Sequence, residues 1–145
     1  PEKSLKFYRD VLGMKLLSTR EHAGAKFNLY FLGYVNDESF VENSLSRPGQ
    51  APLEGVLELT WNYGTETDPE FKYHNGNDKP QGYGHIGISV EDAGAFTKSL
   101  EDKFGDKLTW GLKYNQGKMK NIAFLKDPDN YSIEILPSQY DFPKL

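Results

Sequence analysis

The chain has 145 residues, of which 37% are hydrophobic and 26% charged, and its formal net charge at pH 7 is −4. The basic residues are scattered, so nothing in the charge pattern indicates a nucleic-acid surface, and no apolar run approaches the roughly 18 residues that span a bilayer. Because cysteine is absent, disulfides and thiolate ligands are excluded, so a bound metal requires His, Asp or Glu. We expect a globular protein of the cytoplasm that binds neither nucleic acid nor a membrane.

The first half of the sequence predicts one helix followed by three strands. Apolar residues at helical spacing over 1–12 predict the helix, and Gly13 is well placed to end it. Strands are predicted over 14–22, 25–35 and 55–64, the last from its period-two alternation. Polar and turn-forming residues predict a mobile loop over 37–54 and a second loop over 64–82.

The second half repeats this order, with one strand added before its helix. The segment 84–92 alternates as a strand, and Asp92 can cap a helix that ends at Gly105. Three more strands are predicted over 107–114, 120–128 and 131–137, and the turn "DPDN" joins the last two.

The two halves can be overlaid with an offset of 92 positions, because "VLGMKLL" and "KFGDKLTW" both end a helix with glycine and resume with Lys-Leu. We therefore predict an α+β fold of two βαβββ modules, 1–64 and 83–137, with a connecting loop at 65–82 and a tail at 138–145. The first module shows no strand before its helix, so we expect its opening strand to lie upstream of Pro1.

The stretch "GYGHIG" at 82–87 fits the G-x-G-x-x-G pattern of dinucleotide-binding loops. That fingerprint requires a strand before the glycines and a helix directly after them. Here a turn-rich loop precedes the glycines, and "HIGISV" continues as a strand. The pattern therefore favours a strand that carries His85 over a nucleotide site.

Three strands carry a polar side chain that can bind a metal. His85 shares a strand face with Gly87, while Glu58 and Glu134 each stand between apolar neighbours. Buried carboxylates are usually paired or metal-bound, although each residue taken singly also fits an outward-facing strand position. One His and two Glu make a site for a divalent metal. A fourth ligand is expected on the strand that corresponds to that of His85.

The sequence resembles the eukaryotic glyoxalase I (lactoylglutathione lyase) family, which has the vicinal oxygen chelate fold. The likeness runs from Ser4 to about Pro137 and is closest to one half of the tandem, two-domain fungal form. The segments that carry it, in the family's order, are "SLKFYRDVLGMKLL", "KFNLYFLGY", "VLELTWNYGTE", "YHNGN", "GYGHIGISV" and "GKMKNIAFLKDPDNYSIEIL".

The resemblance implies an activity and a metal site. The family isomerises the hemithioacetal of methylglyoxal and glutathione to S-lactoylglutathione, by proton transfer through a metal-stabilised enediolate, and so detoxifies methylglyoxal. By resemblance, Glu58, His85 and Glu134 are metal ligands, and Glu134 is the leading catalytic base with Glu58 opposite it. The metal is expected to be Zn²⁺, with Ni²⁺ or another divalent ion as the alternative, and glutathione is the co-substrate. The family's fourth ligand would lie upstream of Pro1.

The resemblance also suggests substrate-binding residues and partners. Asn62 matches an asparagine that holds the glutathione peptide, Met119 and Phe124 would line an apolar wall, and Lys118 and Lys120 are candidates near the glycyl carboxylate. Since the family builds its site between two modules, the chain is expected to form a homodimer or to pair with a sister domain of a longer chain.

Two departures from the family leave alternatives open. Gln81 stands where many members have an arginine, and Ser132 replaces a tryptophan, which predicts a roomier or wetter wall. These changes are compatible with a non-catalytic ligand-binding module or an inactive tandem half of the same fold. An Fe(II) extradiol dioxygenase is disfavoured, because it requires two histidines and one glutamate and only His85 is suitably placed.

Overall fold

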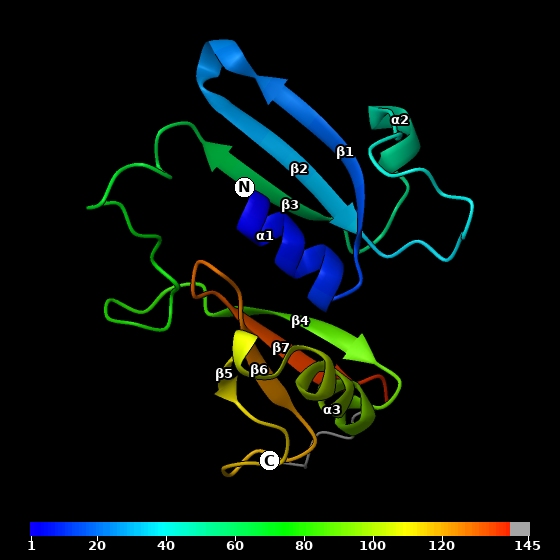
Figure 1. Cartoon of the computed structure of the whole chain (residues 1–145), viewed down its shortest axis with the longest axis vertical. Coiled ribbons are helices and arrows are strands. Elements are labelled where there is room, and N and C mark those ends of the chain that lie inside the picture. Colours follow the sequence, from blue (N-terminus) through cyan, green and yellow to red (C-terminus); the bar gives the residue numbers. More distant parts are fainter. Residues whose placement is uncertain (140–145) are drawn as a thin grey trace. The chain divides into compact units, whose positions relative to one another are not determined.

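The computed structural model describes residues 1–139, and the chain divides into two compact units, Pro1–Phe71 (unit 1) and Lys72–Leu145 (unit 2). The division falls inside the loop predicted over 65–82. Figure 1 shows a helix and a sheet in each unit. Within residues 1–139 no helix has both the length and the apolar character needed to cross a membrane. The mixed α+β architecture agrees with the fold class predicted from the sequence.

Unit 1 begins with the predicted helix, which has two segments. The α-helical turn α1 (Glu2–Lys6) continues as a π-helical turn, η1 (Phe7–Val11), and Gly13 follows with a φ of +76°. Only a residue without a Cβ adopts this backbone region without strain, so the glycine ends the helix as the sequence predicted. Phe7, Tyr8 and Leu12 are buried.

The three strands of unit 1 form one antiparallel sheet in the order β1-β2-β3. Their bounds are β1 Lys15–His22, β2 Phe27–Gly33 and β3 Leu57–Asn62, within those predicted. In the loop predicted over 37–54, a short helix α2 (Arg47–Gln50) forms because the Ser46 side chain accepts a hydrogen bond of 3.2 Å from the Gly49 N–H.

The outer edge of β1 is covered by the loop that follows β2. The Asn43 and Leu45 N–H groups donate to the carbonyls of Leu16 and Leu17, at 2.7 and 3.0 Å. The Glu42 carboxylate adds a bond of 3.1 Å from the Leu16 N–H and an ion pair with Arg9. These contacts satisfy backbone groups that an open sheet edge would leave available for pairing with another chain.

Glu42→Gln is expected to lower the free energy of unfolding by about 1 kcal/mol at pH 7, since the ion pair is half-exposed. Burial acts to raise the pKa of Glu42, but the bonds from Arg9 and the Leu16 N–H, with the charges of Arg9 and Lys15, lower it. A lowered folded-state pKa gives stability that is present above the usual value of 4.5 and lost as the pH falls through the folded value. Urea unfolding at pH 7 and pH 3 should therefore show a deficit at pH 7 that is smaller at pH 3. An equal deficit at both values contradicts this role of the charge.

Unit 2 has a strand on each side of its helix. Strand β4 (His85–Val90) leads to α3 (Ala93–Phe104) and a short 3₁₀ turn, η3 (Gly105–Lys107). Strands β5 (Thr109–Leu112), β6 (Ala123–Lys126) and β7 (Ser132–Pro137) follow, and the sheet order is β4-β7-β6-β5. The first and last strands in the sequence of this unit, β4 and β7, lie side by side and parallel.

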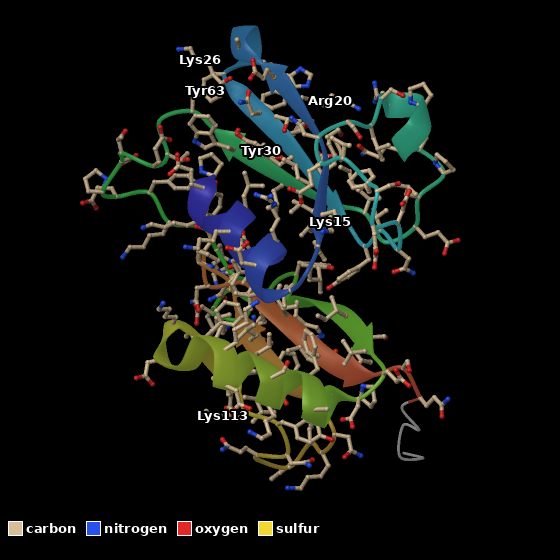
Figure 2. All side chains as sticks on the ribbon, turned by 45° about the vertical axis from the view of Figure 1, so that its right-hand side comes forward. Lys15, Arg20, Lys26, Tyr30, Tyr63 and Lys113 are labelled. Carbon is tan, nitrogen blue, oxygen red and sulfur yellow. The ribbon has the colours of Figure 1, made fainter. Side chains whose placement is uncertain are left out.

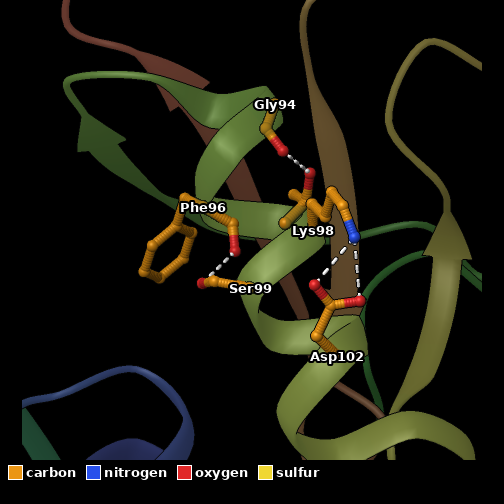
Figure 3. A network of polar contacts seen from close by, with 6 residues as sticks. Gly94, Phe96, Lys98, Ser99 and Asp102 are labelled. Carbon is orange, nitrogen blue, oxygen red and sulfur yellow. Dashed lines mark hydrogen bonds and ion pairs between the residues drawn. The ribbon is translucent and has the colours of Figure 1, made fainter.

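Helix α3 has the ends predicted from the sequence. The Asp92 side chain accepts a bond of 2.9 Å from the Ala95 N–H, and Gly105 closes the helix with a φ of +53°. Figure 3 shows polar contacts along this helix, among them the ion pair of Lys98 with Asp102 at 2.7 Å. The helix packs on β4 and β7. Its buried residues and the apolar strand residues form the core of the unit, which comprises Ile88, Ala93, Leu100, Ile122, Ala123, Leu125, Ile133 and Ile135.

Candidate metal and substrate site

The pairing of β4 with β7 brings His85 and Glu134 together. His85 lies opposite Ser132 in the parallel register, and Gly87 lies opposite Glu134. The His85 Nε2 and Glu134 Oε2 atoms are 3.3 Å apart, and the two side chains are 44% and 22% exposed. Ile86 and Ile88 point to the core side, as the period-two pattern predicted. The face away from the core therefore carries an imidazole and a carboxylate in contact.

Two neighbours shape this pair. Phe124 on β6 is the cross-strand partner of Glu134, and its ring meets the His85 ring edge-on, with centroids 5.2 Å apart. Gly87 has no Cβ, which leaves the backbone of β4 uncovered beside Glu134. A Cβ at this position would contact Glu134 Oε2 at 3.8 Å and the Leu136 side chain at 3.4 Å. The imidazole is thus held against an aromatic edge, and the carboxylate rests over open backbone.

The distance within the pair fits a shared cation. Nitrogen and oxygen ligands about 2.0–2.2 Å from one Zn²⁺ lie about 3–3.6 Å from each other, and the His85–Glu134 separation falls in this range. The two residues are therefore suited to bind one divalent metal from adjacent strands.

The third predicted ligand, Glu58, belongs to unit 1. It is exposed on β3, on the same strand face as Thr60 and Asn62, and opposite the half-buried Leu57 and Leu59. Among residues 1–139 no three His, Asp or Glu side chains are gathered into one metal site. The structure thus assembles the part of the predicted ligand set that comes from unit 2, and the role of Glu58 stays a prediction.

The loop before β4 is hydrogen-bonded to the residues next to His85. The Asn77 side-chain amide donates to the Gly84 carbonyl at 2.8 Å and to Ser132 Oγ at 3.3 Å. Asn75 is buried and its Oδ1 accepts the Asn77 N–H at 2.8 Å. Gly76 between them has a φ of +76°, and a Cβ there would overlap the Tyr83 backbone carbonyl. This packing holds the backbone directly before His85.

Ser132 does not leave the open wall that its replacement of a tryptophan predicted. It is only 6% exposed. Its hydroxyl accepts a bond of 2.8 Å from Lys126 Nζ in addition to the one from Asn77. Lys126 is the cross-strand partner of Ser132, and its stem passes over Gly111, where a Cβ would stand 3.3 Å from Lys126 Cε. The position is therefore closed by a lysine instead of a tryptophan.

The remaining residues predicted to bind substrate lie at a strand end and in a loop. Asn62 ends β3 on the Glu58 face, and Lys118, Met119 and Lys120 lie in the exposed loop between β5 and β6. Met119 is 50% exposed. Of the predicted apolar wall, the structure places Phe124 beside His85 and Glu134 and leaves Met119 in the loop.

The glycine pattern at 82–87 does not form a nucleotide loop. The glycines enter β4, and the next helix begins only at Ala93. The helix N-terminus that a pyrophosphate requires is therefore not adjacent to the glycines.

Sequence reasoning overlooked two cations on the polar faces of the sheets. Lys126 bonds Ser132 beside His85, and Arg20 on β1 shares a face with Glu58. Lys126 follows the buried Leu125, and this alternation, which also identified Glu58 and Glu134, could have identified it. Arg20 stands between the polar residues Thr19 and Glu21, so the alternation in β1 gives no such signal.

Comparison with known proteins gives the same family at the level of sequence and structure. Residues 1–135 match the model of the "Glyoxalase/Bleomycin resistance protein/Dioxygenase superfamily". The chain is 60% identical over 140 residues to glyoxalase I of Saccharomyces cerevisiae, covering 94% of this chain and 40% of that protein. It is 41% identical over 136 residues to lactoylglutathione lyase of Pseudomonas putida, covering 93% of this chain and 77% of that protein.

Among solved structures, the trypanothione-dependent glyoxalase I of Leishmania major superposes with a TM-score of 0.64 at 31% identity, over 95% of this chain and 78% of that one. The chain spans about two fifths of the length of the yeast protein and about three quarters of the bacterial one. It therefore belongs to the Glyoxalase/Bleomycin resistance protein/Dioxygenase superfamily and, within that superfamily, to the glyoxalase I family.

Proposed function

We propose that the protein carrying this chain is a metal-dependent lactoylglutathione lyase, which converts the hemithioacetal of methylglyoxal and glutathione into S-lactoylglutathione. The observation that carries the proposal is the 3.3 Å pairing of His85 Nε2 with Glu134 Oε2 on the open face of a sheet. The names of the relatives at 60% and 41% identity support it.

His85 and Glu134 would hold the metal, Zn²⁺ or alternatively Ni²⁺, with Glu58 as a further ligand. When bound, such an ion supplies Lewis-acid stabilisation of the negative charge that develops on the substrate oxygens. The Phe124 ring against His85 fixes the orientation of the imidazole, so that its Nε2 stays directed at Glu134.

Glu134 would act as the base. Its carboxylate removes the proton from the hemithioacetal carbon that bears the sulfur and the hydroxyl, and a proton returns to the neighbouring carbon. The two transfers leave the total of atoms and electrons unchanged, so the reaction needs no oxidant or reductant. Glu58 is the second carboxylate of the proposal and would serve the opposite side of the substrate. Asn62 would bind the peptide part of glutathione. Phe124 and Met119 would contact the apolar part of the substrate, and Lys118 and Lys120 would lie near the glycyl carboxylate.

We further propose that the site is completed by a second module, in a homodimer or in a sister domain of a longer chain, because Glu58 lies in a different unit from His85 and Glu134. The proposed activity would detoxify methylglyoxal in the cytoplasm. The absence of cysteine from the sequence is compatible with that reducing compartment.

The proposal is tested by following S-lactoylglutathione formation from methylglyoxal and glutathione, with the natural protein purified in the presence of Zn²⁺ or Ni²⁺. Glutathione-dependent turnover supports a lyase. Metal and glutathione binding without turnover supports the alternative of a non-catalytic ligand-binding module.

Removal of the metal is expected to abolish turnover reversibly. Treatment with a chelator should reduce the rate to the background of the assay, because the remaining carboxylates cannot stabilise the developing charge alone. Addition of Zn²⁺ or Ni²⁺ should restore it, and metal analysis should show the loss and recovery in parallel. Undiminished turnover by demonstrably metal-free protein would refute the metal-dependent mechanism.

A further inference from the structure

The face of the unit 1 sheet that carries Glu58 also carries a cation. The antiparallel registers align Ser18, Phe31 and Glu58 in one row across the sheet. Arg20, Leu29 and Thr60 form the next row, and His22, Phe27 and Asn62 the third. The stacking of the His22 and Phe27 rings, with centroids 4.6 Å apart, agrees with this assignment of side chains to one face. Arg20 therefore lies on the same surface as Glu58 and Asn62.

Arg20 leans along this face toward the row of Glu58. Its guanidinium carbon lies 6.0 Å from the centroid of the Phe31 ring, which belongs to the neighbouring row. Arg20 on β1 and Glu58 on β3 are separated by two strand spacings across the sheet, about 9–10 Å, and by two residues along the strands, about 7 Å. The surface between them is apolar, formed by Leu29 and Phe31 of β2. A small molecule lying across β2 can reach both side chains.

The guanidinium group lacks a protein acceptor at one of its nitrogens. Arg20 Nη2 is buried and has no hydrogen-bond partner among residues 1–139. None of the ion pairs of this part of the chain includes Arg20. Buried donors are nearly always satisfied, and leaving a charged one unpaired is costly, so an unpaired buried donor points to an acceptor supplied from outside the chain.

From these observations we infer that Arg20, which is labelled in Figure 2, binds a carboxylate of the peptide thiol and so is a specificity-determining residue of the site on this face. This inference rests on the proposed function, which supplies the ligand class. Its chemistry matches the arginine fork, whose planar donors pair with carboxylates through two parallel bonds. Because Nη2 is buried in the free protein, the guanidinium must turn outward beside Phe31 to meet the carboxylate.

A role in ligand binding and a role in folding make opposite predictions for stability. An arginine that holds unit 1 together would destabilise the fold when removed. An arginine with an unpaired buried nitrogen instead costs stability in the free protein, so Arg20→Met should unfold thermally at the same temperature as the wild type or higher.

The decisive test is a calorimetric titration of the metal-loaded natural protein with S-methylglutathione. Arg20→Met is expected to weaken binding about tenfold or more, as the loss of a charge-assisted bond predicts. Arg20→Lys, which keeps the charge but not the fork, should recover only part of the affinity. Lys3→Met, which removes an exposed cation from α1 of the same unit, is the matched control and should bind as the wild type does. The number of sites of each affinity is read from the same titrations.

Esters of the same ligand identify the acceptor. If the glycyl carboxylate is bound, the Arg20→Met defect disappears with the glycyl monoethyl ester; if the glutamyl carboxylate is bound, it disappears only with the diester. Either result supports the inference. A defect that is unchanged with the diester, a lowered melting temperature of the free variant, or unweakened binding of S-methylglutathione overturns it.

The same titrations separate this inference from the proposed function. Tight, Arg20-dependent binding without turnover supports the carboxylate contact and refutes the lyase. Normal turnover with Arg20-independent binding supports the lyase and refutes the contact. A wild-type protein that does not bind the tripeptide refutes both.

Discussion

Glu134→Gln is expected to lower kcat for S-lactoylglutathione formation by at least about a hundredfold, since general base catalysis typically contributes two to four orders of magnitude. The amide has nearly the shape of the carboxylate, but it cannot accept the proton from the hemithioacetal carbon. The substitution also removes one anionic partner of His85, which lies 3.3 Å away. Metal content and KM must therefore be measured with kcat, because a lost ligand and a lost base both slow the reaction.

The control for this substitution is Glu91→Gln, which neutralises an exposed carboxylate just after β4 in the same unit. Its kcat and metal content should equal those of the wild type. If Glu134→Gln retains its metal and loses kcat at an unchanged KM, Glu134 is the base. Retention of kcat with bound metal would show that another group takes the proton, and Glu58→Gln would then be the variant that loses activity.

Gly76→Ala is expected to destabilise unit 2 by about 2–4 kcal/mol, within the upper range for a single substitution. The φ of +76° disfavours any side chain at this position, and the added Cβ would overlap the Tyr83 carbonyl. Because the obstacle is backbone, it cannot be relieved by a rotamer change. The 75–84 loop must therefore open for the alanine to be accommodated.

The substitution should also affect His85 and its contact with Glu134. Opening the loop releases Asn77 from the Gly84 carbonyl and from Ser132, directly before His85. Amide hydrogen exchange should show lost protection over the loop and the first residues of β4, together with weaker metal binding. Gly82→Ala is the matched control, since it lies in the same loop, lacks a positive φ and has no atom within 4 Å of the added Cβ. Equal stabilities of the two variants would contradict the assigned role of Gly76.

The local elements of this protein are determined by its sequence alone, because they depend on neighbours in the chain. Gly13 and Gly105 end helices at positive φ, and Asp92 caps α3. The alternation in β3, β4 and β7 placed Glu58, His85 and Glu134 on strand faces opposite their apolar neighbours. The order of helices and strands, and with it the α+β class, followed from these patterns. The short helix α2 was missed because a single capped turn carries little periodic signal.

Contacts between distant segments were decided by the tertiary structure. The parallel neighbourhood of β4 and β7, whose paired residues are about fifty positions apart, put His85 in contact with Glu134. The register of β6 with β7 placed Lys126 beside Ser132, and the loop before β4 placed Asn77 there, where the sequence predicted an opening. Arg20 could be recognised as a candidate binding residue only from the structure, which shows Nη2 buried without an acceptor on the face of the sheet that carries Glu58. Periodicity tells which side of a strand a residue faces, but strand pairing and register arise from the packing of whole sheets, and those decide what the residue meets there.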